Sequence, residues 1–269
     1  MRPVSLPGSS ATVDRPVVLV APAKLTRSLR VVGVRADGYH LIDAEMVTLD
    51  LCDELVVEPT PDADRSALEV RSAATGFAVA ADADNLVLRA LALVRRQAHV
   101  RLTKRIPAGG GLGGGSADAA AVLRWAGWRD LARAAALGAD VAFCVVGGRA
   151  RVRGIGEVVD PLPFVDEALT LVLPPFGCAT PAVYAAWDEL GGPTADGPND
   201  LEPAALRVEP RLARWRDALG DATGQTPVLA GSGSTWFVPG AHPGPDRLVV
   251  RTVPADADAG AGAGAAVPG

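Results

Sequence analysis

A run of glycines near the middle of the chain restricts the fold more than any other feature. Six of the seven residues from Gly109 to Gly115 are glycine, and an alanine-rich stretch follows. Because glycine has no Cβ, the backbone can adopt positive φ and turn successive N–H groups into one concavity. A helix that begins there adds the positive end of its dipole. Residues 107–118 therefore predict a phosphate-binding turn, with Ser116 and Asp118 in the first turn of the helix.

Two common phosphate motifs do not match this run. The P-loop requires a lysine before its last Ser or Thr, and here Gly115 directly precedes Ser116. A GxGxxG pattern can be drawn from Gly109, but no acidic residue that follows a strand lies about 20 residues further on, as a ribose ligand would. The remaining alternative is a flexible linker. It is disfavoured because the run joins a strand-like segment, 100–104, to a helix-forming one.

Composition limits the class of protein. The chain has 269 residues, is 49% hydrophobic and carries a net charge of −5, so it can form one large or two medium domains. Its basic residues are scattered, which argues against a nucleic-acid partner. Residues 1–15 lack the apolar core of a signal peptide, and no apolar stretch is long enough to span a membrane. Three widely separated cysteines, Cys52, Cys144 and Cys178, favour a cytoplasmic protein without a zinc site.

The order of expected elements suggests two units. The first opens with strand segments at 17–23 and 29–34 and a turn at 36–38, followed by a strand pair or one long bent strand at 46–58. It continues with helices at 85–97, 114–128 and 131–137 and an apolar element at 141–146. The second has strands at 168–173 and 247–253, helices at 181–190 and 203–219, and a glycine turn at 230–234. A proline-rich seam divides them, which gives domains 1–160 and 161–254 and a disordered Ala/Gly tail, 255–269.

Three separated segments together resemble one family. They are Ala21-Pro-Ala-Lys-Leu25, the glycine run, and Gly231-Ser-Gly-Ser-Thr235. In this order they are similar to the three motifs of the GHMP small-molecule kinases. The resemblance implies an α+β, two-domain fold with a ribosomal-protein-S5-like N-terminal domain and a ferredoxin-like C-terminal domain. It also implies that ATP and the acceptor bind in the cleft between them, with Mg²⁺ accompanying the ATP.

Four motifs, the first of them part of a segment already named, resemble a narrower branch of this family. They are Pro22-Ala-Lys-Leu25, Asp37-Gly-Tyr-His40, Leu137-Gly-Ala-Asp-Val141 and Asn199-Asp-Leu-Glu-Pro203. The branch implies ATP-dependent phosphorylation of a hydroxyl on a cytidine-diphosphate-linked methylerythritol, a step of non-mevalonate isoprenoid synthesis. Two alternatives stay open: another GHMP-type kinase acting on homoserine, mevalonate or a sugar, and a nucleotide-binding relative without activity.

The resemblance assigns roles to individual residues. Asp140 would accept the proton of the acceptor hydroxyl, and Lys24 would lie in ion-pair reach of it. The alternative for Asp140 is a turn or helix cap, and for Lys24 a solvated surface lysine. ATP would be bound by the segment from Pro107 to Ala117, with these members: Pro107, Ala108, Gly109, Gly110, Gly111, Leu112, Gly113, Gly114, Gly115, Ser116 and Ala117. Metal ligands are not identifiable from the sequence.

The acceptor end is assigned in the same way. Tyr39 would stack on the cytosine, His40 would hydrogen-bond its polar edge, and Thr180 and Tyr184 would supply the opposite wall. Ordinary turn and core roles are the alternatives for these residues. Thr26 stands where the family usually has asparagine, and is expected to make a weaker substrate contact. Asn85 is a further candidate neighbour of the nucleotide.

Overall fold

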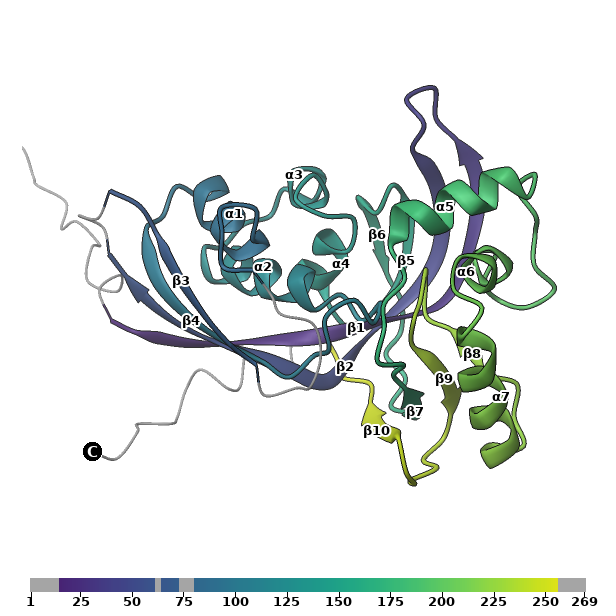
Figure 1. Ribbon diagram of the computed structural model, residues 1–269. Coiled ribbons are helices and arrows are strands. Elements are labelled where there is room, and N and C mark those ends of the chain that lie inside the picture. The colour runs from purple at the N-terminus through teal and green to yellow at the C-terminus, as the bar shows by residue number, and fades with distance from the viewer. Residues whose placement is uncertain (1–14, 61–63, 73–79, 256–269) are drawn as a thin grey trace, which may run out of the picture.

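The first sheet is built on two long strands. The computed structural model describes residues 15–60, 64–72 and 80–255, and so leaves the expected tail outside them except for Ala255. β1 (Val17–Val34) and β2 (His40–Pro59) pair antiparallel along nearly their whole length and are joined by a tight turn. The expected opening of strand, turn and strand is therefore confirmed, with longer strands than the sequence indicated (Figure 1).

The second edge of β2 is shared by two strands because β2 is so long. Its C-terminal part pairs with β4 (Ala98–Lys104), and its N-terminal part pairs with β5 (Arg149–Gly154). β3 (Ala67–Ser72) lies parallel to β4, and β6 (Val158–Pro161) lies antiparallel to β5. The first part of the proline-rich segment expected to form a seam is thus an edge strand of the first sheet.

Four helices cover one face of this sheet (Figure 1). They are α1 (Leu86–Leu93), α2 (Gly114–Trp125), α3 (Leu131–Ala135) and α4 (Val141–Val146). α2 lies in the middle, in contact with β1, α1 and α4, and every residue from Ala117 to Leu123 is buried. Small alanine side chains allow this close approach on several sides. Among the described residues, no helix has the length and apolar character to cross a membrane.

The second sheet has four antiparallel strands in the order β10-β7-β9-β8. They are β7 (Ala168–Val172), β8 (Val228–Leu229), β9 (Trp236–Pro239) and β10 (Arg247–Arg251). Between β7 and β8 the chain forms α5 (Thr180–Glu189), α6 (Glu202–Val208) and α7 (Leu212–Thr223). One helix was expected over residues 203–219, but the structure has two. The break comes at Glu209, because a residue before proline is disfavoured in helical conformation, and Glu209 has φ −135°.

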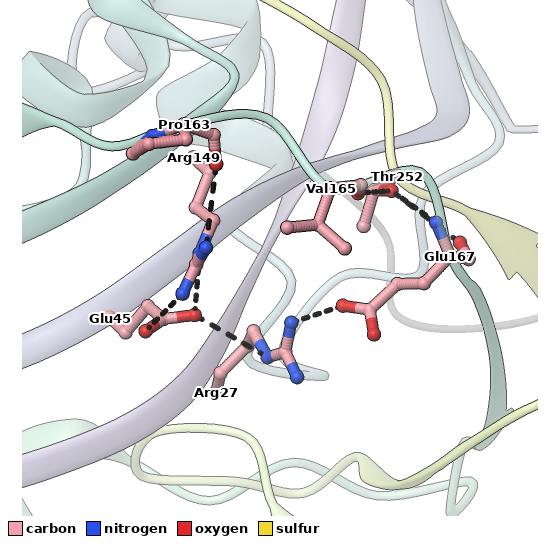
Figure 2. A network of polar contacts seen from close by, with 7 residues as sticks. All are labelled: Arg27, Glu45, Arg149, Pro163, Val165, Glu167 and Thr252. Atoms are coloured by element: carbon pink, nitrogen blue, oxygen red, sulfur yellow. Dashed lines mark hydrogen bonds and ion pairs between the residues drawn. The ribbon is translucent and has the colours of Figure 1, made fainter.

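A strip of polar contacts joins the two sheets (Figure 2). Arg27 on β1 pairs with Glu167, which precedes β7, and its Nε lies 3.6 Å from Oε1 of Glu45 on β2. Arg149 on β5 donates to the same Glu45. The hydroxyl of Thr252, just after β10, accepts the backbone N–H of Glu167 at 3.0 Å. The segment just after β10 also reaches the first sheet, because the N–H of Val253 donates to the carbonyl of Thr48 on β2 at 3.0 Å, and so the two sheets are tied together.

Candidate active site

Lys24 lies where the pairing of β1 with β2 is irregular. The β2 partner shifts from Cys52 to Thr48 between Pro22 and Lys24. At this irregularity the backbone N–H of Lys24 donates instead to the carbonyl of Leu112 in the glycine run, with N and O 3.0 Å apart. The side chain is only 6% exposed. The strand thus brings a buried ammonium group directly under the glycine loop.

Asp140 is the partner of this ammonium group. Nζ of Lys24 lies 3.1 Å from Oδ2 of Asp140 and also donates to Oγ1 of the buried Thr26, at 3.1 Å. Asp140 stands at the N-cap of α4, but its side chain makes no capping hydrogen bond. It keeps 28% of its side-chain surface exposed. The carboxylate therefore faces the ammonium group and remains accessible to a ligand.

The glycine loop approaches its neighbours too closely for side chains. Gly109, Gly111 and Gly113 all have positive φ, and α2 begins directly after Gly113. A Cβ on Gly113 would lie 2.7 Å from Cγ of Lys24, and one on Gly111 would lie 2.7 Å from the carbonyl oxygen of Gly233. A pocket of about 330 Å³ lies over the loop and is lined by residues 107–116 together with Leu86 and Lys104. The loop thus leads directly into the N-terminus of α2, and the pocket lies at that end of the helix.

The third glycine motif supports the loop from the second unit. Thr235 donates to the carbonyl of Gly110 through its hydroxyl, at 2.6 Å, and through its backbone N–H, at 3.2 Å. The amide of buried Asn199 donates to the carbonyls of Leu229 and Gly231, at 2.8 and 2.7 Å. Asn199 therefore anchors the turn at residues 230–234, and Thr235 after this turn anchors the glycine loop.

A buried charge cluster beside the loop was not expected from the sequence. Nζ of Lys104 contacts Oδ2 of Asp53 and lies 2.7 Å from Oδ2 of Asp118. The other oxygen of Asp53 accepts the N–H groups of Arg105 and Ile106. Burial raises the pKa of Asp118 to about 7, against the lowering effect of Lys104. Charged residues inside apolar strands are the signal for such a cluster, but they do not reveal their partners.

A larger pocket, about 900 Å³, lies on the other side of Asp140. It is lined by the turn at Tyr39 and His40, by Thr180 and Tyr184 of α5, and by the residues just before Asp140. Tyr39 is 60% exposed, whereas Tyr184 packs against the core with its ring 4.6 Å from that of His40. Burial, followed by the charge on Asp140, raises the pKa of the Tyr184 hydroxyl. The aromatic pocket thus adjoins the Lys24–Asp140 pair.

Two remaining candidates have partners within the protein. The hydroxyl of Thr180 is hydrogen-bonded to that of Ser232, at 2.9 Å, in the turn beside the glycine loop. Asn85 is the N-cap of α1: its side chain accepts the N–H of Val87 and donates to the carbonyl of Ala80. Thr180 therefore joins the wall of the larger pocket to the turn that supports the glycine loop, while the Asn85 side chain is occupied in starting a helix.

Comparison with known proteins relates this site to one family. Residues 85–148 match the GHMP kinases N terminal domain. A 4-diphosphocytidyl-2-C-methyl-D-erythritol kinase of Paracoccus denitrificans is 41% identical over 81% of this chain and 84% of its own length. The chain belongs to the 4-diphosphocytidyl-2-C-methyl-D-erythritol kinase family. Another member, from Rhizobium meliloti, is 35% identical over 88% of both chains.

Solved structures agree with this family and confirm the expected fold. A crystal structure titled 4-(cytidine 5'-diphospho)-2C-methyl-D-erythritol kinase has 31% identity and a TM-score of 0.70, and the match covers 87% of this chain and 98% of that one. A homoserine kinase from Cytophaga hutchinsonii, at 17% identity and a TM-score of 0.59 over 93% and 97% of the two chains, shares the fold. This chain thus has the α+β, two-domain fold of the GHMP kinases.

Proposed function

We propose that this protein transfers the γ-phosphoryl group of ATP to the 2-hydroxyl of 4-diphosphocytidyl-2-C-methyl-D-erythritol in the non-mevalonate isoprenoid pathway. The observation that carries the proposal is the position of the Lys24–Asp140 pair. The pair touches the glycine loop on one side, through Gly113, and adjoins the aromatic pocket on the other, through Ala139 and Tyr184. A phosphoryl donor and a nucleotide-bearing acceptor would meet at this point.

The glycine loop would bind the triphosphate of ATP. Backbone N–H groups between Pro107 and Ala117, together with the start of α2, favour an anionic ligand. Little covalent chemistry is required of a protein that transfers a phosphoryl group, so positioning and charge stabilisation are its main contributions. The close contacts of Gly111 and Gly113 keep the loop in place for this purpose.

Asp140 would accept the proton of the attacking hydroxyl. Its carboxylate is partly exposed and lies 3.1 Å from Lys24 Nζ, whose positive charge would orient it for the acceptor hydroxyl. Thr26 lies at the same ammonium group and would contact the acceptor near the reacting hydroxyl. Lys24 would also offset negative charge on the phosphoryl group as it moves.

The aromatic pocket would bind the cytidine end of the acceptor. Tyr39 is exposed and available to stack on a flat base, and Tyr184 lies on the α5 wall of the same pocket. His40 would hydrogen-bond the edge of the base, and Thr180 would form part of the opposite wall together with Tyr184. Such a pocket has no evident use for a small acceptor such as homoserine or mevalonate.

Mg²⁺ fits this site as a companion of ATP. No group of three or more acidic, His or Cys side chains able to hold a metal occurs within residues 15–60, 64–72 and 80–255. Mg²⁺ commonly needs only one or two protein groups besides phosphate oxygens and water. The half-buried Ser116 in the first turn of α2 would supply a hydroxyl ligand. When bound, the ion neutralises charge on the phosphates.

The proposed domains follow the two sheets, with residues 1–160 around the first, 161–254 around the second, and 255–269 as a tail. The first boundary falls at the end of β6, which belongs to the first sheet. We place the reaction in the cytoplasm on the strength of the three cysteines, which are too far apart in the sequence to indicate a disulfide framework.

ATP consumption with Mg²⁺ and 4-diphosphocytidyl-2-C-methyl-D-erythritol tests the proposal. Turnover that needs this acceptor and is lost in Lys24→Ala and Asp140→Asn supports it. Homoserine, mevalonate and galactose serve as competing acceptors in separate reactions. Phosphorylation of one of these while the cytidyl substrate is inert would contradict the assigned acceptor. Binding of ATP without turnover of any acceptor would favour an inactive relative.

A further inference from the structure

Helix α5 holds the imidazole ring of His40 from three sides. Tyr184 and Trp187 place their rings against it, with centroids 4.6 and 5.5 Å away, and Oδ1 of Asp188 lies 2.9 Å from Nε2. The three residues are spaced by three and four along the helix and so share one face. The His40 side chain is only 10% exposed as a result. The orientation of the ring is therefore fixed by α5 and not by its own turn.

The support behind this contact is itself restrained. Nε1 of the buried Trp187 donates to the carbonyl of Pro193 at 3.0 Å. Gly192 has positive φ, and a Cβ at this position would lie 2.9 Å from the Trp187 ring. The end of α5 thus leaves Trp187 little room to move. Asp188 follows Trp187 in α5, so the same restraints fix the backbone position from which its carboxylate contacts His40.

The Asp188 contact determines which nitrogen of a neutral His40 carries the proton. An ionised carboxylate only accepts hydrogen bonds, so Nε2 must be the donor. The other nitrogen, Nδ1, then has a free lone pair. Within the residues that the structure describes, Nδ1 has no hydrogen-bond partner, and His40 lines the aromatic pocket. The neutral ring therefore offers a hydrogen-bond acceptor to a ligand there.

We propose that Asp188 is a positioning residue that makes His40 an acceptor and so selects a pyrimidine bearing an amino group over one bearing a carbonyl group. The inference rests on the proposed function, because it assigns a nucleobase to the aromatic pocket. Cytosine carries an exocyclic amino donor where uracil carries a carbonyl acceptor. A hydrogen-bond acceptor on His40 pairs with the amino group of cytosine but faces another acceptor in the carbonyl group of uracil. Uracil would leave both buried acceptors without a donor, and this lowers its affinity relative to cytosine.

The first test is the protonation of the ring. The chain has only three histidines. Nitrogen-15 NMR spectra of the full-length wild type, His99→Gln and His242→Gln are compared, and the imidazole signals that remain in both variants are assigned to His40. We expect wild-type His40 in its neutral form to carry the proton on Nε2, and Asp188→Asn to give a mixture of the two tautomers. An unchanged tautomer in Asp188→Asn would overturn the proposed role of Asp188 whatever the enzyme's substrate is.

The second test is discrimination between bases. CDP and UDP binding to the full-length protein is measured by calorimetry, and kcat and KM are measured with the cytidyl substrate and its uridyl analogue. We expect Asp188→Asn to reduce the preference for cytosine about tenfold, the value of one hydrogen bond, mainly through KM. Glu189→Gln is the matched control, because Glu189 is an exposed neighbour that pairs with Arg207, at 3.2 Å. Its base preference should equal that of the wild type.

The outcomes separate this inference from the proposed function. Loss of base preference in Asp188→Asn with an unchanged kcat supports the inference. An equal loss of base preference in Glu189→Gln would assign the effect to the charge of the helix and would overturn the inference. An unchanged ratio of CDP affinity to UDP affinity in Asp188→Asn would overturn it as well. If the wild type binds CDP in preference to UDP but phosphorylates no cytidyl substrate, the proposed function fails and the base selection stands.

Discussion

Nζ of Lys24 lies 3.1 Å from Oδ2 of Asp140, and this pair joins β1 to the start of α4. Two features hold it there: the irregular pairing of β1 beside Lys24 and the hydrogen bond from its N–H to Leu112. One charge is buried and the other partly exposed, so a ligand can reach the carboxylate but not displace the ammonium group easily. The arrangement suits proton transfer beside a polyanion.

Removal of either member of this pair should abolish catalysis without unfolding the protein. We expect Asp140→Asn to lower kcat by about 10²–10⁴-fold, the usual contribution of a positioned acid or base, with a small change in KM for ATP. The double variant Lys24→Met, Asp140→Asn should be little worse than Lys24→Met alone, because the two act as a unit. Steady-state kinetics measures both effects. Full turnover in Asp140→Asn would contradict the assigned proton acceptor.

Gly113 should tolerate no side chain, even a methyl group. In Gly113→Ala the new Cβ would meet Cγ of Lys24 at 2.7 Å, and the residue would keep positive φ. We expect a loss of about 2–5 kcal/mol in the free energy of unfolding, from backbone strain and overpacking together, and a large loss of kcat, since Lys24 must move. Gly127→Ala is the control, because Gly127 has φ +72° with nothing within 4 Å. It should lose only about 1–2 kcal/mol from backbone strain and keep its activity.

The sequence predicted those features of the candidate site that depend on a few neighbouring residues, and did not predict those that depend on contacts between distant segments. The glycine loop, the apolar strand segment before Lys24 and the turn before His40 each rest on a few adjacent residues. The cluster of Asp53, Lys104 and Asp118 could not be predicted, because its members come from β2, β4 and α2 and meet only in the fold. β8 could not be predicted either. It has only two residues, too few to show the alternation of apolar and polar side chains that identifies a strand.

The Asp118 carboxyl should make stability depend on pH. Its pKa is raised from 3.8 to about 7, mainly by burial. Between these values the folded protein retains a proton that the unfolded chain has released, so rising pH reduces the contribution of Asp118 to the free energy of unfolding. That contribution is fully present below about pH 4 and is lost as the pH rises through about 7.

Urea unfolding of the wild type and Asp118→Asn across this range measures the effect. We expect the wild-type free energy of unfolding, minus that of Asp118→Asn, to decrease steadily as the pH is raised. Asparagine does not titrate, so all other groups cancel in the difference to a first approximation. A difference that stays constant or grows with pH would contradict a raised pKa.

Asn199 should affect ATP binding although it lies away from the glycine loop. Its amide holds the carbonyls of Leu229 and Gly231, and the turn that follows holds Gly110 through Thr235. Asn199→Asp keeps the size of the side chain but removes both donors and buries a charge, so we expect the free energy of unfolding to fall by about 1–3 kcal/mol.

In the folded fraction of this variant, KM for ATP should rise several-fold while KM for the cytidyl substrate changes less, because the loosened turn supports the glycine loop. Gln225→Ala is the control: this half-buried amide also donates to a carbonyl, that of Pro239, at 3.0 Å. We expect its KM for ATP to equal that of the wild type. A parallel rise in both KM values of Asn199→Asp would indicate general loosening of the second unit instead of a path through Thr235 to the loop.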